Sequence, residues 1–97
     1  MTKDSSILDL IERLPLREKG WIIVDNWDAD LCAVGVALKE NPRRLIYIGT
    51  FGKGDGRYDF EYELPVGPQS TDFVIVDRGH DVDELALLEA IMRHLKQ

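Results

Sequence analysis

Acidic side chains that could bind a metal ion are concentrated in the segment Asp25–Asp30, directly after an apolar run. Carboxylates at Asp25, Asp28 and Asp30 could hold Mg²⁺ or Ca²⁺. The spacing does not complete an EF-hand loop, because no glycine or closing glutamate follows at the required positions. An Asx-type turn explains the same residues without a metal, and a contact loop anchored by Trp27 is a third interpretation. A small metal-dependent enzyme centred on this cluster stays an alternative, and the leading prediction includes no metal and no cofactor.

No other residues form a convincing catalytic set. The glycines at 52, 54 and 56 precede another predicted strand, whereas a phosphate-binding loop opens a helix, so they indicate a hairpin turn. Cys32 lies in an apolar run without a histidine partner, and His80 and His94 are isolated from other metal-binding residue types. We therefore expect no catalytic residues and a protein that is not an enzyme.

Residues 58–64 alternate strictly between apolar and acidic types, which is typical of a strand with one buried face. If Phe51 faces Arg57 across the glycine-rich turn, pairing of this strand with residues 45–51 follows. That register places Ile46 beside Tyr62, Ile48 beside Phe60, Tyr47 beside Glu61, Leu45 beside Glu63 and Gly49 beside Asp59. A slip of one residue would press the carboxylates against isoleucines and desolvate them, which selects this register.

The three carboxylates of this strand have two interpretations. Neighbours on one face stand about 7 Å apart, and each pair repels by only about 0.6 kcal/mol in water, so a plain solvated face is tolerated. Alternatively, the row is an acidic surface with an aromatic anchor for a partner rich in Lys and Arg. The candidate partner-binding residues are Tyr47, Asp59, Glu61 and Glu63, with a second patch at Trp27, Asp28 and Asp30.

The remaining pattern predicts an α+β fold in the order α-β-β-β-β-β-α. We expect helices over residues 6–14 and 82–95, the second capped by Asp81. Strands are expected at 21–24, 31–38, 45–51, 57–64 and 73–76, with Asn41 and Pro42 ending the second. Short connections favour a mostly antiparallel five-stranded sheet with both helices packed on one face.

Length and charge narrow the classes of protein further. The 97 residues fit a single domain, 1–97. A formal charge of −6 disfavours direct binding to nucleic acid or anionic membranes and favours basic partners. The first residues lead into an amphipathic segment rather than a signal-type apolar stretch, and Cys32 is expected to be a buried thiol. We therefore expect a cytoplasmic protein.

Three segments, Trp21–Ala37, Arg44–Gly52 and Arg57–Glu63, make the chain resemble small bacterial immunity proteins. These belong to polymorphic toxin systems such as contact-dependent growth inhibition, and the resemblance covers about residues 20–64. It implies a protein that binds and neutralises the C-terminal toxin domain of its own system in the cytoplasm. Many such toxins are nucleases with basic substrate grooves, which an acidic face would suit.

A different class of function stays open beside the immunity protein and the metal-dependent enzyme. The chain could be a regulatory or assembly module without catalysis, with a homodimer formed through the open face of the sheet.

Overall fold

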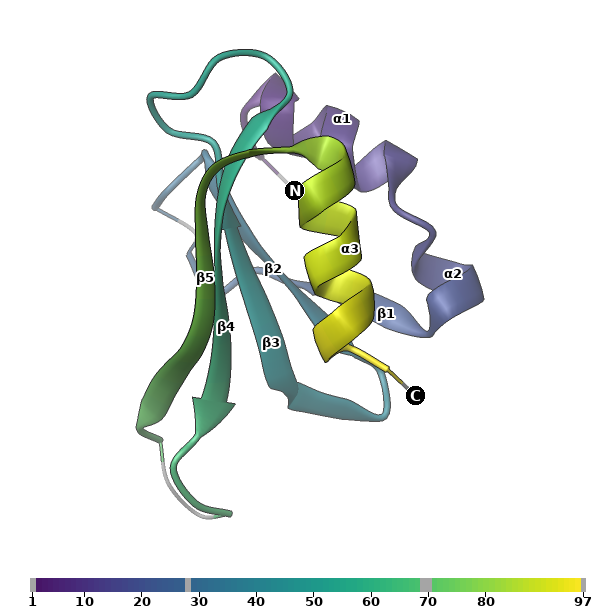
Figure 1. Ribbon diagram of the computed structural model, residues 1–97, viewed down its shortest axis with the longest axis vertical. Coiled ribbons are helices and arrows are strands. Elements are labelled where there is room, and N and C mark those ends of the chain that lie inside the picture. Colours follow the sequence, from purple (N-terminus) through teal and green to yellow (C-terminus); the bar gives the residue numbers. More distant parts are fainter. Residues whose placement is uncertain (1, 28, 69–70, 97) are drawn as a thin grey trace.

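Five antiparallel strands form one sheet in the sequential order β1-β2-β3-β4-β5, and the helices cover one of its faces (Figure 1). The computed structural model describes residues 2–27, 29–68 and 71–96. The elements are α1 (Ser5–Arg13), α2 (Leu16–Lys19), β1 (Trp21–Val24), β2 (Ala33–Leu38), β3 (Asn41–Gly49), β4 (Arg57–Pro65), β5 (Phe73–Asp83) and α3 (Glu84–His94). The predicted α+β class and element order are confirmed, with the short helix α2 in addition.

The core lies between the sheet and the two longer helices. Ile7 and Leu10 of α1 and Leu87 and Ile91 of α3 are fully buried against the sheet. Their sheet neighbours are alternate residues of the strands, among them Val34, Val36, Ile46, Ile48, Tyr58, Phe60 and Tyr62. This face of the sheet is therefore closed by helices.

The predicted register between β3 and β4 is confirmed. Ile46 pairs with Tyr62, and Ile48 pairs with Phe60, so both isoleucines point into the core. Tyr47 pairs with Glu61, Leu45 with Glu63, and Gly49 with Asp59. These residues point to the opposite side of the sheet, which we call the outer face.

The last strand is much longer than predicted. The sequence indicated a strand at 73–76 and a helix capped by Asp81, but β5 continues to Asp83 and α3 begins at Glu84. Asp83 is the N-cap, because its side chain accepts a hydrogen bond from Ala86 N. Asp81 has a positive φ of 53°, and its backbone N–H donates to the Asp59 carboxylate. Pairing with β4 thus extends a segment of low intrinsic strand propensity.

Two smaller predictions, the place of Pro42 and the burial of Cys32, were also wrong. Pro42 does not end the strand region but lies in the first residues of β3, where Leu38 pairs with Asn41 across the tight turn from β2. Cys32 is half-buried in the turn before β2 rather than buried within a strand. None of the described helices is long and apolar enough to cross a membrane.

Candidate protein-binding surface

The outer face is lined by alternate residues of all five strands. Close packing is possible there because Gly35 and Gly49 leave room for larger side chains. A Cβ atom on Gly35 would lie 2.5 Å from Leu45 Cδ1 and 3.0 Å from Trp27 Cζ3, and one on Gly49 would lie 2.7 Å from the Tyr47 hydroxyl. The two glycines therefore let the rings of Trp27 and Tyr47 lie close to the sheet.

The loop after β1 folds back over the outer face and joins two predicted patches into one. The rings of Trp27 and Tyr47 meet edge to face, with centroids 5.2 Å apart. Leu45 beside them is only 5% exposed, so it is covered by its own chain. Asp30 lies near enough for its charge to act on Tyr47, whose pKa is raised by burial and then by the carboxylates of Asp30, Glu61 and Asp59. Asp28 lies outside the described residues.

Lys3 fixes the position of this loop. Its side chain is 0% exposed, and its ammonium donates to the carbonyl oxygens of Trp27, at 3.0 Å, and Asp30, at 2.8 Å. The same ammonium is 2.8 Å from Asp25 Oδ1. No local pattern indicated this role, because Lys3 is more than twenty residues from the loop in sequence.

The same contacts bear on the alternative metal site. A metal ion bound by Asp25 and the loop carbonyls would have to displace the Lys3 ammonium, which already pairs with Asp25 and donates hydrogen bonds to the carbonyl oxygens. Asp30 Oδ1 accepts a hydrogen bond from Cys32 N at 3.0 Å, as in an Asx-type turn. Within residues 2–27, 29–68 and 71–96, no three His, Cys, Asp or Glu side chains are grouped so that they could hold a metal.

The three carboxylates of β4 differ in their surroundings. Asp59 is 3.2 Å from Lys53 Nζ and 2.9 Å from His80 Nδ1, and it accepts the hydrogen bond from Asp81 N at 2.8 Å. Burial alone would raise the pKa of Asp59, but the Asp81 N–H and the Lys53 ammonium outweigh it, so this pKa lies below its usual range. The negative charge of Asp59 is thus largely compensated by groups of the protein itself.

Glu61 and Glu63 have no such compensation. Neither carboxylate forms an ion pair or accepts a hydrogen bond from a described side chain, although Arg78 is the cross-strand neighbour of Glu61. Both side chains are half-buried. The pKa of Glu63 is raised, first by burial and then by the charge of Glu61. These two residues are the uncompensated part of the acidic row.

Two hollows flank Tyr47 on this face. The first, about 630 Å³, is lined by Ala29, Asp30, Leu31, Cys32, Tyr47, Gly49, Phe51 and Asp59. The second, about 430 Å³, is lined by Tyr47, Asp59, Phe60, Glu61, Arg78, Gly79 and His80. Phe51 is 82% exposed at the rim of the first. Sequence reasoning placed Phe51 in a strand and missed this exposure, because β3 ends two residues earlier at Gly49.

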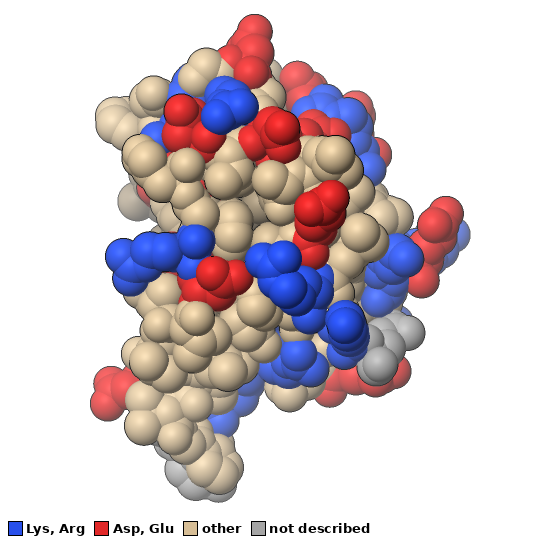
Figure 2. Space-filling view, viewed as in Figure 1, with Lys and Arg blue, Asp and Glu red and all other residues tan. Residues whose placement is uncertain are grey.

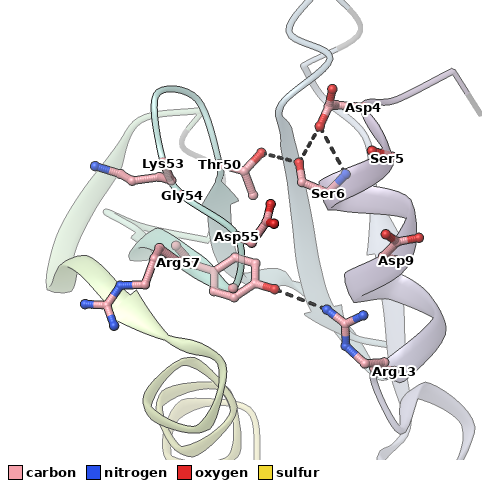
Figure 3. Close-up of a pocket in the computed structure, with 12 residues that line it drawn as sticks. Asp4, Ser5, Ser6, Asp9, Arg13, Thr50, Lys53, Gly54, Asp55 and Arg57 are labelled. Atoms are coloured by element: carbon pink, nitrogen blue, oxygen red, sulfur yellow. Dashed lines mark hydrogen bonds between the residues drawn. The ribbon is translucent and has the colours of Figure 1, made fainter.

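A further polar pocket of about 380 Å³ lies between α1 and the loop that joins β3 and β4 (Figure 3). Ser6 Oγ is 2.6 Å from Asp4 Oδ2 and 2.7 Å from Thr50 Oγ1, which ties the start of α1 to the end of β3. The hydrogen bonds from Ser6 lower the pKa of Asp4, so this carboxylate is a weak base. Asp4, whose side chain also accepts a hydrogen bond from Ser6 N, is thus the N-cap of α1.

Comparisons of the chain with family models, with curated proteins and with solved structures gave no match.

Proposed function

We propose that this protein is an immunity protein, which binds the basic toxin domain of its own system in the cytoplasm and neutralises it without catalysis. The observation that carries the proposal is the pair of carboxylates Glu61 and Glu63. They are half-buried and uncompensated, and they lie on the same face as the contacting aromatic rings of Trp27 and Tyr47. A partner's Lys or Arg would supply the missing charge.

The aromatic pair and the carboxylates have different roles in this proposal. Trp27 and Tyr47 are large, partly exposed and held in place by the Lys3-bound loop, so they lose little side-chain entropy when a partner binds. Glu61 and Glu63 attract a basic surface over a longer range and increase the rate of association. The hollows on either side of Tyr47 offer room for side chains of the partner.

This surface suits a nuclease toxin in particular. The groove of a nuclease is basic because it binds phosphates, and half-buried carboxylates can occupy the same cationic side chains. A cation bound beside Glu63 would also lower its raised pKa, so complex formation would release protons in the pH range where free Glu63 is partly protonated.

Charge reversal of the two glutamates tests the proposal. The double variant Glu61→Lys and Glu63→Lys should associate with the toxin domain encoded beside this protein at least about tenfold more slowly, with a weaker dependence on salt. Stopped-flow or biolayer interferometry measures the association rate. Reversal of Glu12 and Glu89, which are exposed on α1 and α3, is the matched control. Each reversal adds two units of charge, so both double variants change the net charge from −6 to −2.

The control separates a local contact from general electrostatic attraction. An equal loss in both double variants would mean that only the net charge matters, and the assignment of the outer face would be wrong. Unchanged affinity in the Glu61 and Glu63 variant would remove the basis of the proposal altogether. If the neighbouring reading frames encode no toxin, a pull-down from the source cell with the same two variants identifies a partner that depends on these residues.

A further inference from the structure

The first part of β5 is an exposed apolar edge of the sheet. Phe73, Val74, Ile75 and Val76 follow one another without a charged residue and are between 39% and 51% exposed. Ile75 pairs with Glu63 and Val74 with Leu64, so apolar side chains are exposed on both faces of the strand. Exposed edge strands of soluble proteins usually carry charges, because an apolar edge is a template for another strand.

The backbone of this segment also has unpaired groups that point away from the sheet. Val66 N donates to Asp72 O at 3.0 Å, so Val66 and Asp72 form a hydrogen-bonded pair at the end of the ladder between β4 and β5. Because hydrogen-bonded and non-hydrogen-bonded pairs alternate in an antiparallel ladder, the N–H and C=O of Val74 point toward β4. Those of Phe73 and Ile75 point outward, where the sheet ends.

We propose that β5 pairs antiparallel with β5 of a second copy of this chain, about a two-fold axis at Val74. In this register Phe73 pairs with Ile75 of the second copy, Ile75 pairs with its Phe73, and the two Val74 residues face each other. All outward N–H and C=O groups of Phe73 and Ile75 are then used in four hydrogen bonds. A shift of two residues toward Asp77 would run the new ladder across the β-bulge at Val76, where the pairing with β4 passes from Ile75 to Asp77, and a shift the other way would place Thr71 opposite Ile75.

The occupant is a second copy because the segment is complementary to itself. Two copies that each carry −6 repel over most of their surface, but residues 73–76 carry no charge. The end of the β4–β5 hairpin extends beyond the helices in Figure 1, and its surface is mostly uncharged in Figure 2, so a second hairpin can approach. Arg43 braces this end through hydrogen bonds to the carbonyl oxygens of Gly67, at 3.2 Å, and Pro68.

The dimer differs from one formed through the open face of the sheet. Because the axis is perpendicular to the sheet, both outer faces lie on the same side and remain accessible. Few side chains are buried, and interfaces smaller than about 1,200 Å² are typically transient. We therefore expect a reversible equilibrium between monomer and dimer.

Sedimentation equilibrium from about 10 µM to about 1 mM protein tests this interface. The wild type should show a concentration-dependent dimer, and Val74→Lys and Ile75→Pro should weaken it at least tenfold. Proline at 75 removes an outward N–H and leaves the ladder with β4 intact. Leu85→Lys, at a residue 66% exposed on α3, is the control with the same charge change as Val74→Lys and should dimerise like the wild type. Circular dichroism verifies folding, and Val74→Lys alone suffices if Ile75→Pro does not fold.

Cysteine cross-linking tests the register. In a Cys32→Ser background, Val74→Cys should form a disulfide-linked dimer with diamide, because facing residues of a non-hydrogen-bonded pair have Cα atoms about 4.5 Å apart. Ile75→Cys should form far less, because its counterpart lies diagonally at about 7–8 Å. A wild type that stays monomeric at the highest concentration overturns the proposal, even if another protein binds this edge. A dimer that persists in both β5 variants, or a faster cross-link at Ile75, also overturns it.

Discussion

The two faces of the sheet are covered in different ways. The inner face is closed by α1 and α3, and its residues Ile46 and Ile48 are 0% exposed. The outer face also contains buried residues, such as Ala37 and Leu45, and there the ring of Trp27, in the loop after β1, lies near Gly35 and against Tyr47. That loop is held by the buried ammonium of Lys3.

The difference explains where a partner surface can exist. On β2 and β3 the loop already holds the ring of Trp27 near Gly35 and against Tyr47, so the aromatic part of the surface is formed within the protein itself. On β4, Glu61 and Glu63 are half-buried, and neither forms an ion pair with a described residue. Partner binding and folding therefore depend largely on different residues, and four substitutions can test this separation.

The largest effect on stability is expected on the inner face. Ile46→Ala removes fully buried methyl and methylene groups and leaves a cavity between the sheet and the helices, which should lower the free energy of unfolding by about 3 kcal/mol. Urea denaturation measures it. The affinity of the folded variant for a toxin partner should not change, and a loss of affinity at conditions where the protein is fully folded would show that the faces are not independent.

A smaller loss is expected when the loop is released. Lys3→Met removes the ammonium that pairs with Asp25 and donates to the carbonyl oxygens of Trp27 and Asp30, which should lower the free energy of unfolding by about 2 kcal/mol, since Asp25 is partly exposed to water. The loop should also become mobile, with a loss of near-ultraviolet circular dichroism from Trp27. Lys39→Met, at an exposed residue, is the control. If Lys3→Met behaves like this control, the loop does not depend on Lys3.

The smallest effects should have opposite signs along the acidic row. The lowered pKa of Asp59 means that its carboxylate stabilises the fold above its unfolded-state pKa, and that this contribution is lost as the pH falls through the folded-state pKa. Asp59→Asn should therefore be destabilising by about 0.5 kcal/mol at pH 7, after allowance for solvent screening, and near neutral at about pH 2.

Glu63 should behave in the opposite way. Its raised pKa means that the ionised carboxylate is disfavoured in the folded protein, a penalty that is absent below the unfolded-state pKa and complete above the folded-state pKa. Glu63→Gln should thus stabilise the protein slightly at pH 7, by less than about 0.5 kcal/mol, and have no effect near pH 3. Urea denaturation of both variants at the two pH values measures the signs. Destabilisation by both at pH 7 would mean that Glu63 has a cationic partner within the fold.

Local patterns predicted much of the fold but not the extent of β5. The alternation in residues 58–64 and the glycine-rich turn were sufficient for the register of β3 and β4, because a slip by one residue would bury carboxylates. Asp77, Arg78 and Gly79 carry no strand signal, and they are extended because they pair with Tyr62, Glu61 and Phe60 of β4. For the same reason the helix start moved from the predicted cap Asp81 to Asp83.

The sequence alone determined that Asp59, Glu61 and Glu63 share one face with Tyr47, because strand periodicity and turn length are local properties. Only the tertiary structure decided that these carboxylates differ in charge compensation and that the ring of Trp27 packs against Tyr47. It also decided that Lys3 holds the loop that carries Trp27. Charge compensation depends on side chains from other segments, namely Lys53 in the loop between β3 and β4, His80 in β5 and Lys3 before α1. Their positions beside the carboxylates are fixed by how the strands, loops and helices pack.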